Sequence, residues 1–177
     1  NTIRFFDQDM QEAVTERANL EHELRVALNQ GQFELLFQPQ VDNAGLTVGA
    51  EALIRWRHPE RGTVLPGYFI RLAEDTGLIF PIGQWVLNAA CAQLKKWQLH
   101  AHTRNLTLSV NVSAKQFRQA DFVEQVQSAI KLHAVDSKLL KLELTESMLF
   151  KDINTMIANM NRLREIGIRF ELDDFGT

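Results

Sequence analysis

Oxygen-bearing side chains recur near the ends of successive predicted β-strands. Glu51 lies inside an otherwise apolar run, Asn111 closes a second run, and Glu143 lies near the end of a third. Asp173 closes a fourth run, and Asp174 follows it directly. Carboxylates that converge in a partly buried space repel one another, so they must take up protons or hold cations. Because the set contains only Asp, Glu and Asn, the sequence indicates Mg²⁺ or Mn²⁺ rather than zinc.

A framework of alternating strands and helices must bring these residues together. The turn at Asp42–Gly45 joins the first two β-type runs and predicts an antiparallel hairpin. Later runs alternate with helical stretches, which predicts parallel pairing in either an open doubly wound sheet or a closed barrel. No glycine-rich phosphate-binding motif follows a strand, which argues against a Rossmann-type site. The predicted strands are Phe33–Gln40, Thr47–Trp56, Leu106–Asn111, Leu139–Thr145 and Ile168–Asp173, and the predicted helices that separate them are Pro81–Trp97, Asp121–Leu132 and Asn154–Ile166.

The alternation of side chains along each strand predicts which way the polar residues point. Each later strand has one apolar face and one polar face, and side chains two residues apart share a face. If the apolar faces meet helices, the polar faces point into a barrel, with the site near the C-terminal ends of the strands. One inward polar residue would mean little, so the inference rests on equivalent positions in successive strands. The inward residues are Glu51 with Leu53 and Arg55, Asn111 with Thr107 and Ser109, Glu143 with Lys141 and Thr145, and Asp173 with Arg169 and Glu171.

Composition narrows the possible functions. The chain has 177 residues, of which 45% are apolar, and this suits one domain or slightly less. The net charge is -3 with no basic run, so we expect no binding to duplex nucleic acid. Cys91 is the only cysteine, which fits a core residue in a reducing compartment. We find no signal peptide and no apolar stretch of the roughly 18 residues that a membrane span needs. We therefore expect a cytoplasmic domain, whose parent protein could be membrane-tethered.

Two smaller patterns also make predictions. Ser113–Gln116 has the spacing of a helix capping box. Four of the five histidines follow no metal-ligand spacing, and we expect them at the surface or in loops; they are His58, His100, His102 and His133.

The segments around the acidic residues resemble the motifs of EAL domains, bacterial phosphodiesterases for cyclic-di-GMP. Glu51–Trp56 resembles the signature segment of that family, and further motifs follow in the family's order up to residue 177. A lone Glu-Ala-Leu tripeptide would carry no weight, whereas several motifs in the right order are specific. The other matching segments are Gln38-Pro39, His58-Pro59, Gly62, Phe69–Glu74, Asn111–Ser113, Glu143–Glu146 and Asp173–Thr177.

The resemblance implies a fold, a domain division and a site. The implied fold is α/β, a TIM-like (β/α) barrel with an antiparallel first strand, of which about the first five strands are present. Residues 20–177 would form the EAL domain, incomplete at its C-terminal side, and residues 1–19 a connector helix from an upstream GGDEF or sensory domain. The implied catalytic residues are Glu51, Asp173 and Asp174. Two Mg²⁺ or Mn²⁺ ions would be held by Glu51, Asn111, Glu143, Asp173 and Asp174, the substrate by Gln38, Leu53 and Arg55, and the loop after Asp173 would be steadied by Glu146.

The implied activity is metal-dependent hydrolysis of cyclic-di-GMP to linear pGpG, carried out by a homodimer in bacterial second-messenger signalling. The alternative is a catalytically inactive EAL domain that acts as a cyclic-di-GMP receptor or as a dimerisation module. The family's later lysine and its later glutamate ligand have no position in this chain. We therefore expect these residues alone to be inactive, and to aggregate through an open sheet edge.

Overall fold

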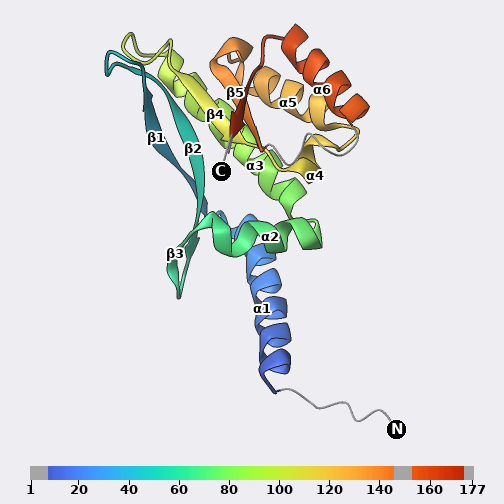
Figure 1. The fold of residues 1–177 in the computed structure, drawn as a ribbon. Coiled ribbons are helices and arrows are strands. Elements are labelled where there is room, and N and C mark those ends of the chain that lie inside the picture. The colour runs from blue at the N-terminus through green and yellow to red at the C-terminus, as the bar shows by residue number, and fades with distance from the viewer. Residues whose placement is uncertain (1–7, 146–152, 174–177) are drawn as a thin grey trace.

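The computed structural model describes residues 8–145 and 153–173 as one sheet with helices packed against it (Figure 1). The described part begins with a long helix, continues through a β-hairpin, and then alternates between helices and strands (Figure 1). The elements are α1 (Gln8–Gln30), β1 (Phe33–Val41), β2 (Thr47–His58), β3 (Gly62–Val64), α2 (Pro66–Thr76), α3 (Ile79–Gln98), β4 (Thr107–Asn111), α4 (Ala114–Phe117), α5 (Phe122–His133), the 3₁₀ turn η1 (Ser137–Leu139), β5 (Leu140–Thr145), α6 (Ile153–Glu165) and β6 (Arg169–Asp173).

The sheet has six strands in the described part of the chain. Its order is β1-β2-β4-β5-β6, and β3 pairs with β2 alone. β1 and β2 are antiparallel, whereas β2, β4, β5 and β6 run parallel to one another. Over residues 8–145 and 153–173 the sheet does not close, so the fold is a partial barrel. The prediction of an α/β barrel with an antiparallel first strand is confirmed in this form.

The core lies between the apolar face of the sheet and the helices. On the sheet side, Leu108, Leu140 and Leu142 are fully buried. On the helix side, α3 contributes Ile82 and Leu94, which are at most 1% exposed. Burial of these aliphatic side chains stabilises the layer by roughly 1.5–3 kcal/mol for each one removed from water. Because one face of each strand is used in this way, the other face is free to carry polar groups.

The bounds of the predicted strands, and of the three predicted helices that separate them, differ from the observed ones by one or two residues, but β3, α2 and the 3₁₀ turn η1 had no prediction. β3 is a three-residue strand that pairs with the end of β2, too short to leave a periodic pattern. α2 begins with Pro66, which suits the first helical turn, and ends before Gly77, whose φ of 78° is left-handed. This helix buries Phe69, Leu72 and Ala73 and lies beside the site described below.

The first helix extends away from the sheet and joins the core only in its second half (Figure 1). Residues 11–19 are exposed, whereas Leu24 and Ala27 are fully buried. Arg17 pairs with Asp75 of α2 at 2.7 Å, which links the exposed half to the domain. No helix among the described residues is both long and apolar enough to cross a membrane.

His58 corrects one prediction from the sequence. His100 and His102 are exposed, as expected, but His58 is only 6% exposed and lies at the end of β2. Its Nδ1 accepts hydrogen bonds from the backbone N–H groups of Glu60 and Arg61, both at 3.1 Å. Its Nε2 lies 3.3 Å from the Glu23 carboxylate of α1. A surface position is therefore wrong for this residue, which closes the tight turn between β2 and β3 and ties it to the first helix.

Candidate functional site

Strand register brings the predicted polar residues to one face of the sheet. Glu51 lies opposite Gln38 on β1 and Ser109 on β4. Two residues after Ser109 on β4, Asn111 lies opposite Glu143 of β5. Side chains opposite one another in neighbouring strands point to the same side, so the alternation read from each strand extends across the sheet.

Three of the predicted metal ligands lie together on one face of the sheet: Asn111 ends β4, Glu143 lies two residues before the end of β5, and Glu51 lies in the part of β2 that pairs with β4. Asn111 Nδ2 donates a hydrogen bond of 2.7 Å to Glu51 Oε1, which joins β4 to β2. Glu143 is buried, with 7% exposure, and its Oε1 lies 3.4 Å from Gln40 Nε2. Its backbone carbonyl accepts a bond of 3.0 Å from Val112 N–H, which fixes the chain just after Asn111. The side chains are therefore held by neighbouring strands rather than by loops.

Two further predicted ligands and one loop residue are described only in part or not at all. Asp173 ends β6, and its backbone lies opposite Thr145 of β5. Asp174 and Glu146 lie outside the described residues. Among the residues that the structure describes, no group of three His, Cys, Asp or Glu side chains surrounds a common point. The described donors are two carboxylates, Glu51 and Glu143, and the amide of Asn111. These oxygens are of the kind that hard divalent cations prefer, so the residues present fit such an ion.

A second polar layer lies next to the predicted ligands on the same face. Ser109 Oγ, fully buried, donates a bond of 2.9 Å to Glu171 Oε2, and Lys141 Nζ donates one of 2.5 Å to Glu171 Oε1. Burial raises the pKa of Glu171, but hydrogen bonds from Lys141 and Ser109, the Lys141 charge and a contact with Glu143 together lower it below its ordinary value. The sequence assigned no role to Lys141, Ser109 or Glu171, although their alternation placed all three on this face.

The predicted substrate residues lie along β1 and β2. Gln38 is exposed opposite Glu51, and Leu53 lies two residues further along β2. Arg55 is half-buried, and its Nη1 donates a bond of 2.8 Å to the Ile54 carbonyl. This contact uses one of the five N–H donors of the guanidinium. The three side chains share the polar face, so the structure brings them to the same side as the predicted metal ligands.

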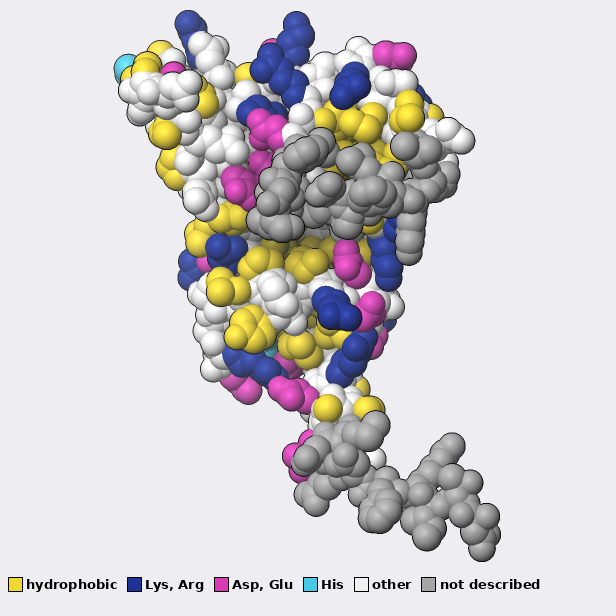
Figure 2. Space-filling view, viewed as in Figure 1, with side chains coloured by type: hydrophobic (Ala, Val, Ile, Leu, Met, Phe, Trp, Pro, Cys, Tyr) yellow, Lys and Arg dark blue, Asp and Glu magenta, His cyan; other side chains and the backbone are white. Residues whose placement is uncertain are grey.

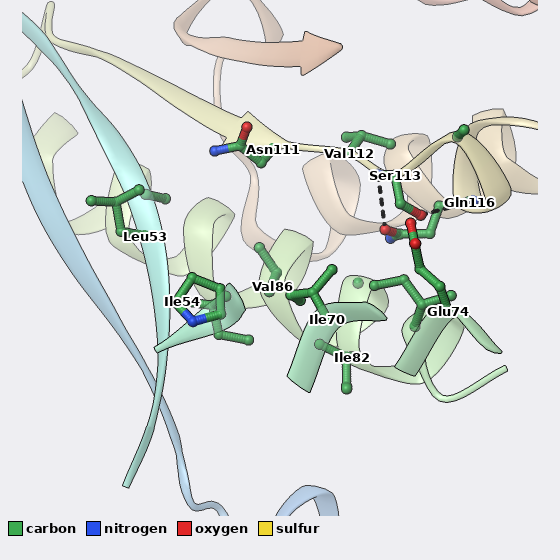
Figure 3. A pocket seen from close by; sticks show the side chains of 15 residues that line it. Leu53, Ile54, Ile70, Glu74, Ile82, Val86, Asn111, Val112, Ser113 and Gln116 are labelled. Carbon is green, nitrogen blue, oxygen red and sulfur yellow. Dashed lines mark hydrogen bonds between the residues drawn. The ribbon is translucent and has the colours of Figure 1, made fainter. Parts of the chain in front are cut away.

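A cavity of about 430 Å³ opens beside Asn111 and Leu53 (Figure 3). α2 and α3 contribute aliphatic side chains to its wall, including Ile70, Ile82 and Val86. Polar groups occur at one end, where Ser113 and Gln116 form the capping box of α4, as predicted (Figure 3). Figure 2 shows, on the side of the molecule that faces the viewer, acidic side chains grouped in the upper part and hydrophobic side chains below them. Such a cavity suits a flat, largely apolar group with a few polar atoms at its edge.

Gly83 allows α3 to approach the capping box closely. A Cβ atom at this position would lie 1.5 Å from Gln116 Nε2. Gln116 Oε1 accepts a bond of 3.2 Å from Ser113 N–H, and Ser113 Oγ accepts one of 3.2 Å from Gln116 N–H. The segment that follows Asn111 is thereby fixed by a side chain for which only glycine leaves room.

Comparison with known proteins identifies the family. A sequence model of the EAL domain matches residues 21–177. MucR of Pseudomonas aeruginosa, described as a bifunctional diguanylate cyclase/cyclic di-GMP phosphodiesterase, is 40% identical over 178 residues, covering 100% of this chain and 26% of MucR. NbdA of the same organism, described as a cyclic di-GMP phosphodiesterase, is 39% identical over 178 residues, covering 100% of this chain and 23% of NbdA. The chain thus spans about a quarter of the length of these curated relatives.

Comparison with solved structures points to the same family. The PaMucR phosphodiesterase in complex with c-di-GMP has a TM-score of 0.86 and 41% identity, over 90% of this chain and 64% of the other. The EAL enzyme Bd1971, with cAMP and cyclic-di-GMP bound, has a TM-score of 0.86 and 32% identity, over 93% of this chain and 46% of the other. The FimX EAL domain from Pseudomonas aeruginosa, at 22% identity and a TM-score of 0.79, shares the fold. By its sequence and by its fold, this chain belongs to the EAL domain family.

Proposed function

We propose that this chain belongs to a phosphodiesterase that hydrolyses cyclic-di-GMP to linear pGpG with the help of divalent metal ions. One observation carries the proposal: Glu51, Asn111 and Glu143 meet on one face of three adjacent strands, beside a cavity of about 430 Å³ that reaches Asn111. The kinship with MucR and NbdA supports the choice of substrate.

In this proposal, Glu51, Asn111, Glu143, Asp173 and Asp174 hold two Mg²⁺ or Mn²⁺ ions. Bound ions of this kind lower the pKa of a water molecule and neutralise the charge of a phosphodiester. The protein's part is to fix its donors before the substrate arrives. The 2.7 Å bond from Asn111 to Glu51 does this for two of them, because it leaves the amide oxygen of Asn111 and the second oxygen of Glu51 available.

The substrate would lie along β1 and β2. Arg55 would pair with a phosphate through the donors that its bond to Ile54 leaves over, and Gln38 would donate to the sugar–phosphate backbone from across the hairpin. Leu53 lines the cavity, so one guanine base would pack there between aliphatic side chains. The base edge would then face the polar groups at the end of the cavity.

The setting of the domain remains a prediction. We propose that the exposed part of α1, residues 11–19, belongs to a connector that leads from an upstream GGDEF or sensory domain. We also propose a homodimer, from the resemblance to EAL domains. We propose a cytoplasmic location because the single cysteine, Cys91, is a free and buried thiol.

The test is to incubate the complete protein with cyclic-di-GMP and Mg²⁺ and to follow pGpG by chromatography. Appearance of pGpG that stops when EDTA removes the metal supports the proposal. Tight binding of the dinucleotide without product would instead support the receptor function, and neither binding nor product would support a dimerisation module. Replacing Mg²⁺ by Ca²⁺ should suppress turnover, because Ca²⁺ prefers larger and looser coordination than a compact pair of sites offers.

A further inference from the structure

A nearly buried cation lies next to the predicted metal ligands. The Lys141 side chain is 15% exposed, and its ammonium group pairs with Glu171 at 2.5 Å. A charge removed from water in this way is costly unless an opposite charge and hydrogen bonds compensate it. Lys141 therefore needs a carboxylate partner, and the identity of that carboxylate affects the site if it is one of the predicted metal ligands.

Strand geometry puts two carboxylates within reach of this ammonium group. Glu143 lies two residues after Lys141 on the same face of β5, at a backbone separation of roughly 6.5–7 Å that a lysine stem can cover. Glu171 lies directly opposite Glu143 on β6, so the three side chains form a triangle across two strands. In the structure the ammonium group takes Glu171.

A second donor, Ser109, holds the Glu171 carboxylate in the position where it pairs with Lys141. Ser109, fully buried on β4, donates to Glu171 Oε2 at 2.9 Å, while Lys141 donates to Oε1. Both carboxylate oxygens are thus engaged by donors from two different strands. A carboxylate held at both oxygens stays in one position, also where it contacts Glu143, and offers the ammonium group a fixed partner.

We propose that Glu171 is a positioning residue that keeps the Lys141 ammonium group away from Glu143, so that the Glu143 carboxylate stays oriented for a divalent cation. This inference rests on the metal-ligand role proposed for Glu143. It assigns Glu171 no contact with the substrate or the metal. Its effect on the site passes through Lys141.

Mn²⁺ binding to the complete protein, followed by electron paramagnetic resonance and titration calorimetry, tests the proposal without a measurement of turnover. Glu171→Gln keeps the shape and removes the charge, so Lys141 turns to Glu143. We expect Mn²⁺ affinity to fall on the order of 10- to 100-fold, the size of effect known for groups that orient ligands. Adding Lys141→Met to Glu171→Gln should restore most of that affinity, and Lys141→Met alone should cost little or none.

Three outcomes would overturn the inference. If Lys141→Met alone weakens binding as much as Glu171→Gln does, the pair is only a structural link between β5 and β6. If the double variant binds as poorly as Glu171→Gln alone, Lys141 is not the cause of the loss. If the loss disappears at high ionic strength, it reflects net charge at a distance, because salt screens that effect but not a direct contact.

Controls separate this inference from the proposed function. Glu124→Gln breaks an exposed pair of equal length, Arg162 to Glu124 at 2.5 Å, and should leave Mn²⁺ affinity unchanged. Glu143→Gln should abolish binding at the site. If the unaltered protein binds no Mn²⁺ there, the proposed function fails. If it binds Mn²⁺ through Glu143 and Glu171→Gln has no effect, only the present inference fails. Circular dichroism of each variant verifies that the fold is kept.

Discussion

Alanine in place of Gly83 should displace a side chain that orders the segment next to Asn111. The new Cβ would lie 1.5 Å from Gln116 Nε2 and 2.6 Å from its Cδ, and at least the amide must therefore move. Gln116 is 6% exposed, so the amide has little space to occupy elsewhere. Moving it breaks the 3.2 Å bond that its Oε1 accepts from Ser113 N–H.

The expected magnitude follows from these contacts. The lost capping bond costs about 0.5–2 kcal/mol, and repacking around an added methyl group costs about 1–3 kcal/mol. Alanine gains about 0.5–1 kcal/mol over glycine inside a helix, which offsets part of this. We expect Gly83→Ala to destabilise the domain by about 0.5–4.5 kcal/mol in all. We also expect it to lower phosphodiesterase activity, because the chain from Asn111 to Ser113 loses its anchor.

Hydrogen–deuterium exchange of the peptide that covers Asn111 to Phe117 is the most direct assay, since it reports the Ser113 N–H locally even within a larger protein. Exchange there should speed up in Gly83→Ala. Gly67→Ala is the matched control, because nothing lies within 4 Å of the Cβ it would add. Gly83→Ala should cost little in a Gln116→Ala background, where no amide is displaced. Equal costs in the presence and absence of the Gln116 amide would refute the reasoning.

Three further predictions concern separate parts of the domain. Glu51→Ala should lower turnover of cyclic-di-GMP by about 100-fold or more, because a bound metal ion supplies several kcal/mol of charge stabilisation and this variant loses one of its ligands. The circular dichroism spectrum should be unchanged. Full activity in this variant would contradict a metal-ligand role for Glu51. Burial raises the pKa of Cys91 from 9.0 to about 12, so the folded protein should react slowly with Ellman's reagent at pH 8 and the urea-unfolded protein quickly. Since the folded pKa is the higher one, the stability from this thiol is complete below pH 9.0 and is lost as the pH rises toward 12; urea midpoints measured across that range, compared with those of Cys91→Ala, test the sign. His58→Phe should destabilise the domain by about 1–2 kcal/mol, because two backbone N–H groups lose their acceptor, and a urea midpoint equal to that of the unaltered protein would contradict this.

The sequence alone determined the features that depend on neighbours within a few residues. Side chains alternate along a strand and one face must be apolar to be buried, so the polar faces of β4, β5 and β6 could be predicted strand by strand. The hairpin turn at Asp42–Gly45 and the capping box at Ser113–Gln116 depend on short-range hydrogen bonds and were predictable for the same reason. The motifs around Glu51 and Asn111 then indicated the family.

Only the tertiary structure decided how these faces meet. The bond from Asn111 to Glu51 and the pairing of Lys141 with Glu171 join residues 60 and 30 positions apart, and their partners are set by strand register. His58 likewise contacts Glu23 of α1 at the end of β2, and a contact between segments so far apart in the sequence leaves no local pattern. Periodicity assigns each side chain to a face, whereas the choice of partner on that face follows from packing between distant segments.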